Sequence, residues 1–132
     1  MTELEKTEKI TINLGPVDLG QIDLLAQEGF YSNRTDFIRT AIRTQLATHA
    51  EVVKRTVARK TLILGVQYYT RRDLEEVRSA GEKLQINVLG LASIADDVSP
   101  ELAVETIDSV VVLGAFRASA AVKAALAGGS RR

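Results

Sequence analysis

The sequence predicts an α+β fold made of two small parts, namely a strand with two helices near the N-terminus and a compact α/β repeat after them. Two observations support this fold class. Six residues of alternating polarity precede two stretches with apolar residues at helical spacing, and an apolar run ending in Leu-Gly occurs three times in the second half. A chain of 132 residues can hold two such parts but not two large cores.

The first predicted element is a half-buried strand over residues 9–14. Its apolar residues are Ile10, Ile12 and Leu14, and the polar residues that alternate with them are Lys9, Thr11 and Asn13. Gly15 and Pro16 then end the strand, and Pro16 suits the first turn of a helix. A lone strand of this length can neither pair its backbone nor bury its apolar face, so it requires a second chain.

Two helices are predicted after this strand. The first has apolar residues at helical spacing over about three turns and ends at Gly29, which suits a left-handed stop. The second follows a turn in which Ser32 or Asn33 would cap the helix, with Asp36 reaching back to the Asn33 backbone. Its helical period continues toward Arg59 without Gly or Pro, so the linker could be one long helix.

The second half contains a repeat of about 25 residues. An apolar run closed by Leu-Gly ends at Gly65, Gly90 and Gly114, and an aliphatic residue lies twelve positions after each glycine. Each unit is interpreted as a strand, a turn and a short helix. The three helices are predicted at Arg72 to Ala80, Pro100 to Thr106 and Ala120 to Ala127. We therefore expect a small solenoid of three strand-helix units with parallel strands.

These patterns define the predicted domains. Residues 1–8 are acidic and polar and would form a short disordered arm without the features of a secretory signal. Residues 9–50 form the strand-helix-helix unit, 51–60 a helical linker, 61–126 the repeat, and 127–132 a frayed tail. No apolar run approaches the ~18 residues of a membrane span, so we expect a cytoplasmic protein.

The composition excludes several chemistries. There is no cysteine and one histidine, His49, so disulfides, thiolate nucleophiles, zinc-thiolate sites and sites that need several imidazoles are excluded. No metal or cofactor site is therefore expected. The best catalytic candidate is the pair Asp96 and Asp97, but acids before a helix more often stabilise its N-terminus. We expect a protein that is not an enzyme.

The N-terminal part resembles the ribbon-helix-helix family, which includes the Arc and methionine repressors and the plasmid copy-number regulators. The resemblance rests on the segment from Lys9 to Leu14, the helix after Pro16 and above all the stretch from Gly29 to Arg39, and it covers about a third of the chain. It implies a homodimer whose two strands form an antiparallel ribbon over four helices. Such a ribbon fits the major groove of double-stranded DNA.

The resemblance also implies which residues contact DNA. The outward strand residues Lys9, Thr11 and Asn13 would read bases, and Ser32, Asn33 and Arg34 would clamp a phosphate. The clamp is also favoured physically, because the first amides of a helix are unpaired and its dipole end is positive. Arg39 and Arg43 either contact phosphates or pair with carboxylates. The linker cluster Lys54, Arg55, Arg59 and Lys60 either adds contacts to the DNA backbone or forms a solvated face.

The predicted function is a sequence-reading transcriptional regulator, a repressor by preference, found with the nucleoid. Since the ends of a three-unit solenoid lack a neighbour, residues 61–126 would join dimers into tetramers or larger assemblies and make DNA occupancy cooperative. An antitoxin, a plasmid-maintenance or nucleoid-organising DNA binder and a small-molecule-sensing regulator remain alternatives. Nickel sensing through several histidines and a cysteine is excluded by the composition.

Overall fold

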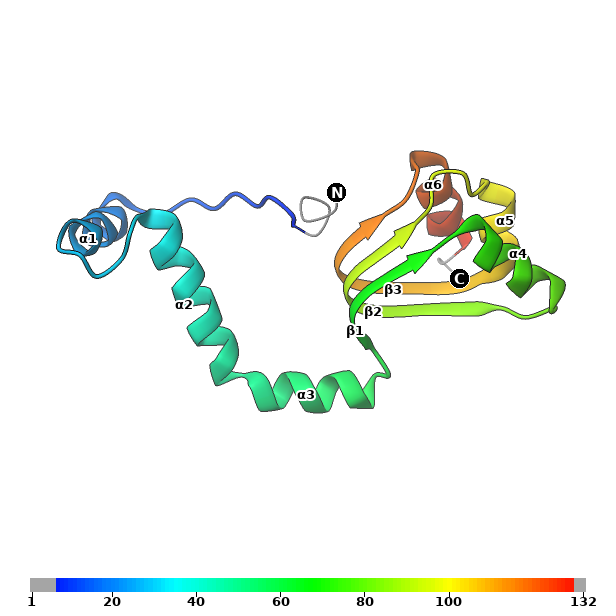
Figure 1. The fold of residues 1–132 in the computed structure, drawn as a ribbon, viewed down its shortest axis with the longest axis horizontal. Coiled ribbons are helices and arrows are strands. Elements are labelled where there is room, and N and C mark those ends of the chain that lie inside the picture. The colour runs from blue at the N-terminus through cyan, green and yellow to red at the C-terminus, as the bar shows by residue number, and fades with distance from the viewer. Residues whose placement is uncertain (1–6, 130–132) are drawn as a thin grey trace. The chain divides into compact units, whose positions relative to one another are not determined.

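The computed structural model describes residues 7–129 of the chain, so most of the predicted arm at residues 1–8 lies outside it. The chain divides into two compact units between Thr56 and Val57. The elements in chain order are α1 (Pro16–Gln27), α2 (Arg34–Thr48), α3 (Ala50–Arg59), β1 (Ile63–Tyr69), α4 (Arg71–Ser79), β2 (Leu84–Ile94), α5 (Pro100–Thr106), β3 (Ile107–Arg117) and α6 (Ala120–Gly129) (Figure 1). This mixture of helices and strands agrees with the α+β class. None of the helices described is long and apolar enough to cross a membrane.

In the first unit, α1 begins and ends where the sequence predicts. Pro16 occupies the first helical position, and the Gly15 carbonyl accepts a hydrogen bond from the Leu19 amide at 3.1 Å. At the other end Gly29 has a φ of 90°, a left-handed conformation that glycine adopts without strain. Because this conformation reverses the chain, the Phe30 amide donates to the Leu25 carbonyl at 3.0 Å and closes the helix.

The turn before α2 is capped by Asn33, one of the two predicted capping residues. The Asn33 side chain accepts a hydrogen bond from the Asp36 amide at 2.8 Å. The Asp36 carboxylate, however, accepts from the Ser32 amide at 2.8 Å and not from Asn33 as predicted. Because the Asn33 backbone is fully extended, the amide of Ser32, and not that of Asn33, faces the Asp36 carboxylate. An edge-to-face contact between the Tyr31 and Phe37 rings, 5.0 Å apart, braces the same turn.

The long helix considered for the linker is interrupted at His49. The His49 amide donates to the Leu46 carbonyl at 3.0 Å, a spacing of three residues that tightens the last turn of α2. The Val53 amide then donates to the His49 carbonyl, so α3 begins immediately. No glycine or proline lies at this point, so no local pattern predicts the interruption.

Residues 7–15 have no regular secondary structure, so the strand predicted at residues 9–14 is not formed within the single chain. Ile10 and Ile12 are 75% and 58% exposed. A strand is defined by hydrogen bonds to a neighbouring strand, and the described part of this chain offers none here. The ribbon therefore stays a prediction about two chains.

The second unit contains a three-stranded parallel sheet with the order β1-β2-β3. Each strand is followed by a helix, and α4, α5 and α6 lie on the concave side of the curved sheet (Figure 1). The core between sheet and helices consists of Leu74, Ile86, Val88, Ala92, Ile94, Val98, Leu102, Ala103, Ile107, Val122 and Leu126. The parallel strands and their alternation with short helices are those expected from the three Leu-Gly runs.

The three glycines lie inside the strands and do not close them as predicted. Gly65, Gly90 and Gly114 occupy the same level of the sheet, with φ values of 131°, 141° and 124°. A Cβ at Gly90 would lie 2.1 Å from the Gly65 carbonyl oxygen, and one at Gly114 would lie 2.1 Å from the Gly90 oxygen. Both the backbone conformation and the lack of space therefore require glycine, and the strands continue beyond it.

The helices of the second unit are close to their predicted bounds. Thr70 and Asp73 form a capping box, in which each side chain accepts the other's amide, so α4 begins one residue earlier than predicted. Ser99 caps α5, whose bounds are as predicted. The tail predicted from Ala127 is wrong as far as Gly129, because α6 continues to that residue after Leu126 has packed into the core.

Candidate nucleic-acid interface

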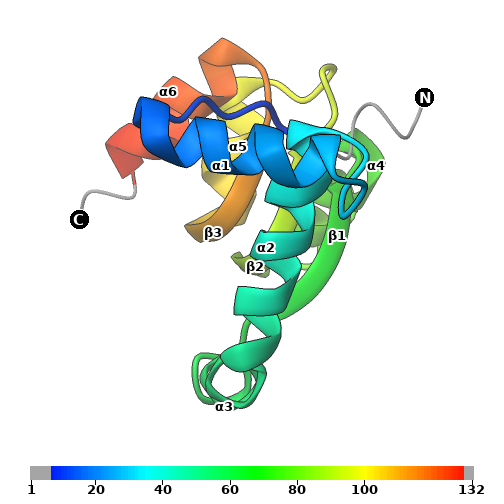
Figure 2. The ribbon, with the colours of Figure 1, turned by 90° about the vertical axis from the view of Figure 1, so that its left-hand side faces the viewer.

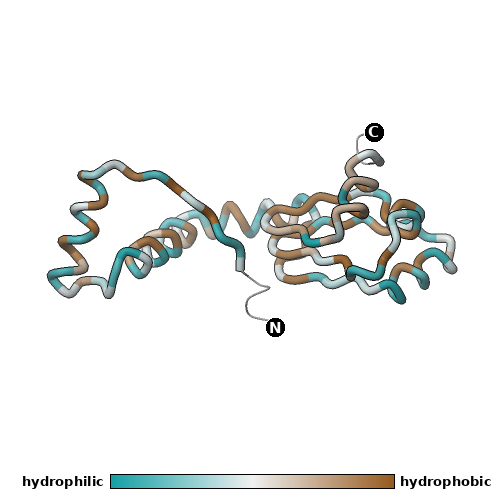
Figure 3. The backbone as a smooth tube through the Cα atoms, turned by 90° about the horizontal axis from the view of Figure 1, so that it is seen from above, coloured by the Kyte–Doolittle hydropathy of each residue, from teal (hydrophilic) through white to brown (hydrophobic). Residues whose placement is uncertain are grey.

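The extended segment before α1 exposes both sets of its alternating residues. Lys9, Thr11 and Asn13 are exposed, as a base-reading role requires. Figure 3 shows hydrophobic and hydrophilic positions alternating along this segment. The polar side chains are thus available to a ligand, and the apolar ones are available to another protein surface.

The apolar residues of this segment form part of an open groove with the two helices that follow. The groove has a volume of about 400 Å³. Its lining comes from the extended segment, α1 and α2 and consists of Ile12, Leu14, Asp18, Gln21, Ile22, Leu25, Phe37, Ile38, Ala41 and Ile42. Figure 2 shows α1 lying across the direction of α2. The groove is mostly apolar and open to solvent.

The beginning of α2 presents unpaired backbone amides. The amides of Ser32 and Asp36 are occupied by the capping interactions described above. Within the described chain, the amides of Arg34 and Thr35 in the first helical turn have no acceptor. These are the donors that a phosphate oxygen would use, and the positive end of the helix dipole favours the anion. Thr35 was not among the predicted phosphate contacts.

Arg34 is bound to Asp23 of α1. Its Nε donates to Asp23 Oδ1 at 2.8 Å, and Nη2 donates to Oδ2 at 3.0 Å. This hydrogen bonding lowers the pKa of the Asp23 carboxyl and raises the pKa of the Arg34 guanidinium. Two of the five N–H groups of Arg34 are engaged, so the others can still donate to a phosphate. The residue predicted as a phosphate ligand therefore also ties the two helices together.

The other basic side chains lie on exposed helix surfaces. Arg39 and Arg43 are four residues apart on α2, away from the residues that line the groove, and neither forms an ion pair within residues 7–129. Lys54, Arg55 and Arg59 are exposed on α3, and Lys60 follows it. Which of the two roles Arg39 and Arg43 have stays a prediction.

The structure brings together only some of the predicted site residues. Ser32, Asn33 and Arg34 lie in one turn, whereas Lys9, Thr11 and Asn13 lie on the separate extended segment. The role of Asp23 was missed by sequence reasoning, because a pair eleven residues apart on two helices leaves no local pattern. Once Asn33 is identified as the capping residue, Thr35 is the second residue of the helix. Its amide then has no acceptor within the helix.

The acids considered as a catalytic pair, Asp96 and Asp97, lie on the surface of the second unit. Asp96 and Asp97 are exposed in the loop before α5, and Asp97 Oδ2 lies 3.9 Å from Arg71 Nε. The side chain that caps α5 is Ser99 and not either acid. Over residues 7–129, no group of three or more histidine, aspartate and glutamate side chains is arranged to hold a metal ion.

Residues 5–123 match the Ribbon-Helix-Helix transcriptional regulator family. The match spans most of the 132 residues, so this chain belongs to that family, as its N-terminal third led us to expect. Membership indicates a DNA-binding transcriptional regulator. The match also includes β1, β2 and β3, and so it covers the sheet of the second unit as well as the N-terminal helices. Comparisons with curated proteins and with solved structures gave no match.

Proposed function

We propose that this protein is a sequence-reading repressor that inserts a two-stranded antiparallel ribbon, one strand from each of two copies, into the major groove of DNA. One observation carries the proposal. In a chain of this family, the segment that would form the ribbon is exposed, and its apolar residues lie beside an open groove while its polar residues point to solvent.

Dimerisation supplies what the single chain lacks. Pairing of two extended segments satisfies their backbone groups, and the groove lined by Ile12, Leu14 and Ile22 receives the apolar residues of the other copy. Burial of each exposed isoleucine contributes about 1.5–3 kcal/mol. The ribbon then exposes two copies of Lys9, Thr11 and Asn13 on one surface.

The chemistry of these three side chains suits base reading. An asparagine amide both donates and accepts, and so pairs with the N6 and N7 groups of adenine. A lysine donates to the acceptors of guanine, and a threonine offers a hydroxyl for hydrogen bonds and a methyl group for thymine. Asn13, Thr11 and Lys9 thus provide three different contacts to the floor of the groove.

Contacts to phosphates position this ribbon. The free amides of Arg34 and Thr35, the remaining donors of Arg34 and the side chain of Arg39 would bind backbone oxygens on either side of the groove. Ser32 and Asn33 contribute by holding the first turn of α2 in place. A protein bound in this way resides with the nucleoid in the cytoplasm.

Residues 61–126 would join dimers into tetramers or larger assemblies, so that neighbouring sites are occupied cooperatively. The sheet and buried core of the second unit favour this role over that of an antitoxin, whose tail is usually disordered.

The test begins with selection of preferred duplexes from a random pool by the full-length protein, followed by fluorescence anisotropy. We expect Thr11→Ala and Asn13→Ala each to cost about 1–3 kcal/mol on the selected site and to relax base preference at one position. Lys83→Ala, an exposed lysine of the second unit, is the charge control and should leave affinity unchanged. A protein that selects no sequence, or variants that keep the wild-type preference, would contradict the proposal.

A further inference from the structure

The sheet of the second unit has one face covered by helices and an opposite face that carries exposed apolar side chains. Side chains alternate along each strand, and Val88 and Ala92 of β2 face the helices. The opposite surface, here named the outer sheet face, consists of Leu64, Val66, Tyr68, Asn87, Leu89, Leu91, Ser93, Val111, Leu113, Ala115 and Arg117. Leu64 is 67% exposed and Leu113 is 54% exposed, whereas Leu91 of the central strand is 6% exposed, and none of the three belongs to the core beneath the helices.

The outer sheet face is ordered in rows across the three strands. The register places Leu64 beside Leu89 and Leu89 beside Leu113, so that one row is leucine throughout. The next row joins Val66, Leu91 and Ala115. Hydrophobic positions of neighbouring strands accordingly lie next to one another in Figure 3.

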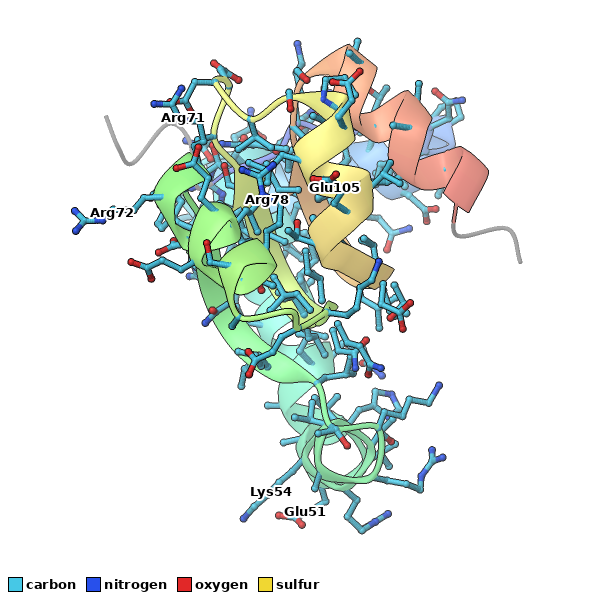
Figure 4. All side chains as sticks on the ribbon, turned by 90° about the vertical axis from the view of Figure 1, so that its right-hand side faces the viewer. Glu51, Lys54, Arg71, Arg72, Arg78 and Glu105 are labelled. Carbon is cyan, nitrogen blue, oxygen red and sulfur yellow. The ribbon has the colours of Figure 1, made fainter. Side chains whose placement is uncertain are left out.

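Charge in this unit is concentrated on the helices. Arg71 pairs with Glu75 and Arg72 with Glu76 along α4, and Arg78 Nη1 lies 3.1 Å from Glu105 Oε1 of α5. Figure 4 shows the Arg78 and Glu105 side chains close together. The outer sheet face has one charged residue, Arg117, which lies beside Ser93 at one end, whereas its leucine row and the row after it carry no charge. A nucleic acid or a charged peptide would therefore find no electrostatic complement on these two rows.

We propose that the outer sheet face packs against the same face of a second copy of this chain. The inference rests on the proposed function, because it names the surface through which residues 61–126 associate. The uncharged rows of two copies suit each other. Dimerisation through the ribbon already gives every molecule two copies of this surface, which raises its effective concentration.

The leucine row makes the face complementary to itself. In an interface with two-fold symmetry, the same patch meets its own copy. An axis between the sheets and along β2 lays β1 of one copy over β3 of the other, so that Leu64 meets Leu113 at the same level and Leu89 meets Leu89. In the next row Val66 meets the smaller Ala115, which lets the two sheets approach.

The first test measures the mass of the full-length protein by analytical ultracentrifugation. Wild-type protein should form tetramers or larger species, and Leu64→Lys with Leu113→Lys should reduce them to dimers. Val104→Lys is the matched control, because Val104 is 46% exposed on α5, outside the outer sheet face. A far-UV circular dichroism spectrum equal to wild type shows that each variant is folded. A double variant that is folded and still forms the tetramers or larger species of the wild type overturns the proposal.

The second test uses the absence of cysteine from the sequence. Protein with Leu64→Cys is mixed with protein carrying Leu113→Cys and treated with a short bis-maleimide, since packed sheets lie ~10 Å apart, beyond the reach of a disulfide. We expect a link between the two positions, and none when Val104→Cys replaces either partner. A link from Leu113→Cys to Val53→Cys in α3 instead would show that a helix covers the face, and would overturn the proposal.

These measurements separate two hypotheses, namely that the outer sheet face packs against its own copy and that residues 61–126 join dimers into tetramers. A link between positions 64 and 113 in a protein that remains dimeric supports the outer sheet face and contradicts the tetramer. Tetramers that form without this link, and that survive the lysine substitutions, contradict the face and leave the assembly intact. Affinity for a short duplex with a single selected site should be unchanged in the lysine double variant. A loss there would show that the surface serves DNA binding and not association.

Discussion

At the residue scale, the turn between α1 and α2 shows how one side chain serves both folding and binding. Arg34 holds the Asp23 carboxylate through two hydrogen bonds and also begins the helix whose free amides face solvent. A bidentate pair fixes the orientation of the guanidinium, so that its remaining donors point in a defined direction. The carboxylate on α1 is therefore a positioning group for the proposed phosphate contact.

The Asp23 pair predicts a change in acid sensitivity. The pKa of Asp23 is lowered by its hydrogen bonds to Arg34, so the pair contributes stability above the ordinary pKa of aspartate and loses it as the pH falls through the lower, folded value. In an Arg34→Gln variant, we expect the Asp23 pKa to rise toward its usual 3.8. A carboxyl-detected NMR titration measures this change directly.

Asp73 provides the internal control for that titration. The Thr70 backbone and side chain lower the pKa of the Asp73 carboxyl. The Asp73 titration should be the same in Arg34→Gln and wild type, because the capping box belongs to the second unit. An Asp23 carboxyl that titrates identically with and without Arg34 would show that the ion pair does not form in solution.

Arg39 predicts a different signature from that of the reading residues. If it binds a phosphate, Arg39→Ala should weaken binding to all sequences alike and reduce the slope of log K against log salt by about 1. Salt titrations by anisotropy, with Arg72→Ala of the second unit as control, measure this slope. An altered base preference, with the salt slope unchanged, would instead make Arg39 a base-reading residue.

At the scale of elements, the row of glycines determines how the strands of the second unit can pack. Gly65, Gly90 and Gly114 each have a positive φ, and at Gly90 and Gly114 the neighbouring carbonyl occupies the space that a Cβ would need. The backbone strain at positive φ and the steric overlap with the neighbouring carbonyl add up. A substitution that introduces a Cβ should therefore destabilise the fold more than either effect alone would.

Gly90→Ala tests this geometry at the central strand. We expect it to lower the free energy of unfolding by more than about 2 kcal/mol, because the left-handed conformation alone costs ~1–2 kcal/mol for a residue with Cβ. Gly128→Ala is the control, since nothing lies within 4 Å of its would-be Cβ in α6. That variant should be neutral or slightly stabilising. Equal urea midpoints for the two variants would contradict the role assigned to the glycine row.

Local signals predicted the elements well, and long-range contacts explain the differences. Pro16 and Pro100 marked helix starts, because proline suits a first turn in any surroundings. The Leu-Gly pairs were interpreted as strand ends, because a glycine in one strand reveals its role only beside the glycine of the next. The interruption at His49 and the Asp23 pair depend on backbone and tertiary geometry that no local pattern records.

The proposed site was predictable to a similar degree. Residues 9–14 alternate so regularly that exposure of Lys9, Thr11 and Asn13 follows from sequence alone. The free amide of Thr35 required the capping residue to be settled first. The outer sheet face was not predicted, because strands that are apolar on both faces usually occur in sheets covered on both sides.

At the scale of the whole molecule, the family match includes both units. A match from residue 5 to residue 123 means that the sheet belongs to the family pattern together with the helices before it. The second unit has its own core and its own ordered strands. We infer that DNA binding and association are properties of separate units of one chain.

A chain ending after Arg59 tests this division. It should still form dimers and bind a single site, but with a Hill slope near that of independent sites on a duplex with two sites, because the surface that links dimers is absent. Light scattering and anisotropy measure mass and slope in the same samples. Truncated and full-length proteins that agree in both would show that residues 61–126 have no part in assembly.

The carbonyl oxygens of the glycine row also determine which strands can be added at the edge of this sheet. The Gly65 carbonyl oxygen of β1 occupies the space that a Cβ at Gly90 in β2 would need. The Gly90 oxygen likewise occupies the space of a Cβ at Gly114 in β3. By the same geometry, a strand joining β3 in this register would need glycine opposite Gly114. Most extended chains lack a glycine at that level, so the Cβ of the residue opposite Gly114 would clash with its carbonyl oxygen and the strand could not pair in this register. The edge of a long, largely uncharged strand, normally a template for aggregation, is thereby protected by its own backbone.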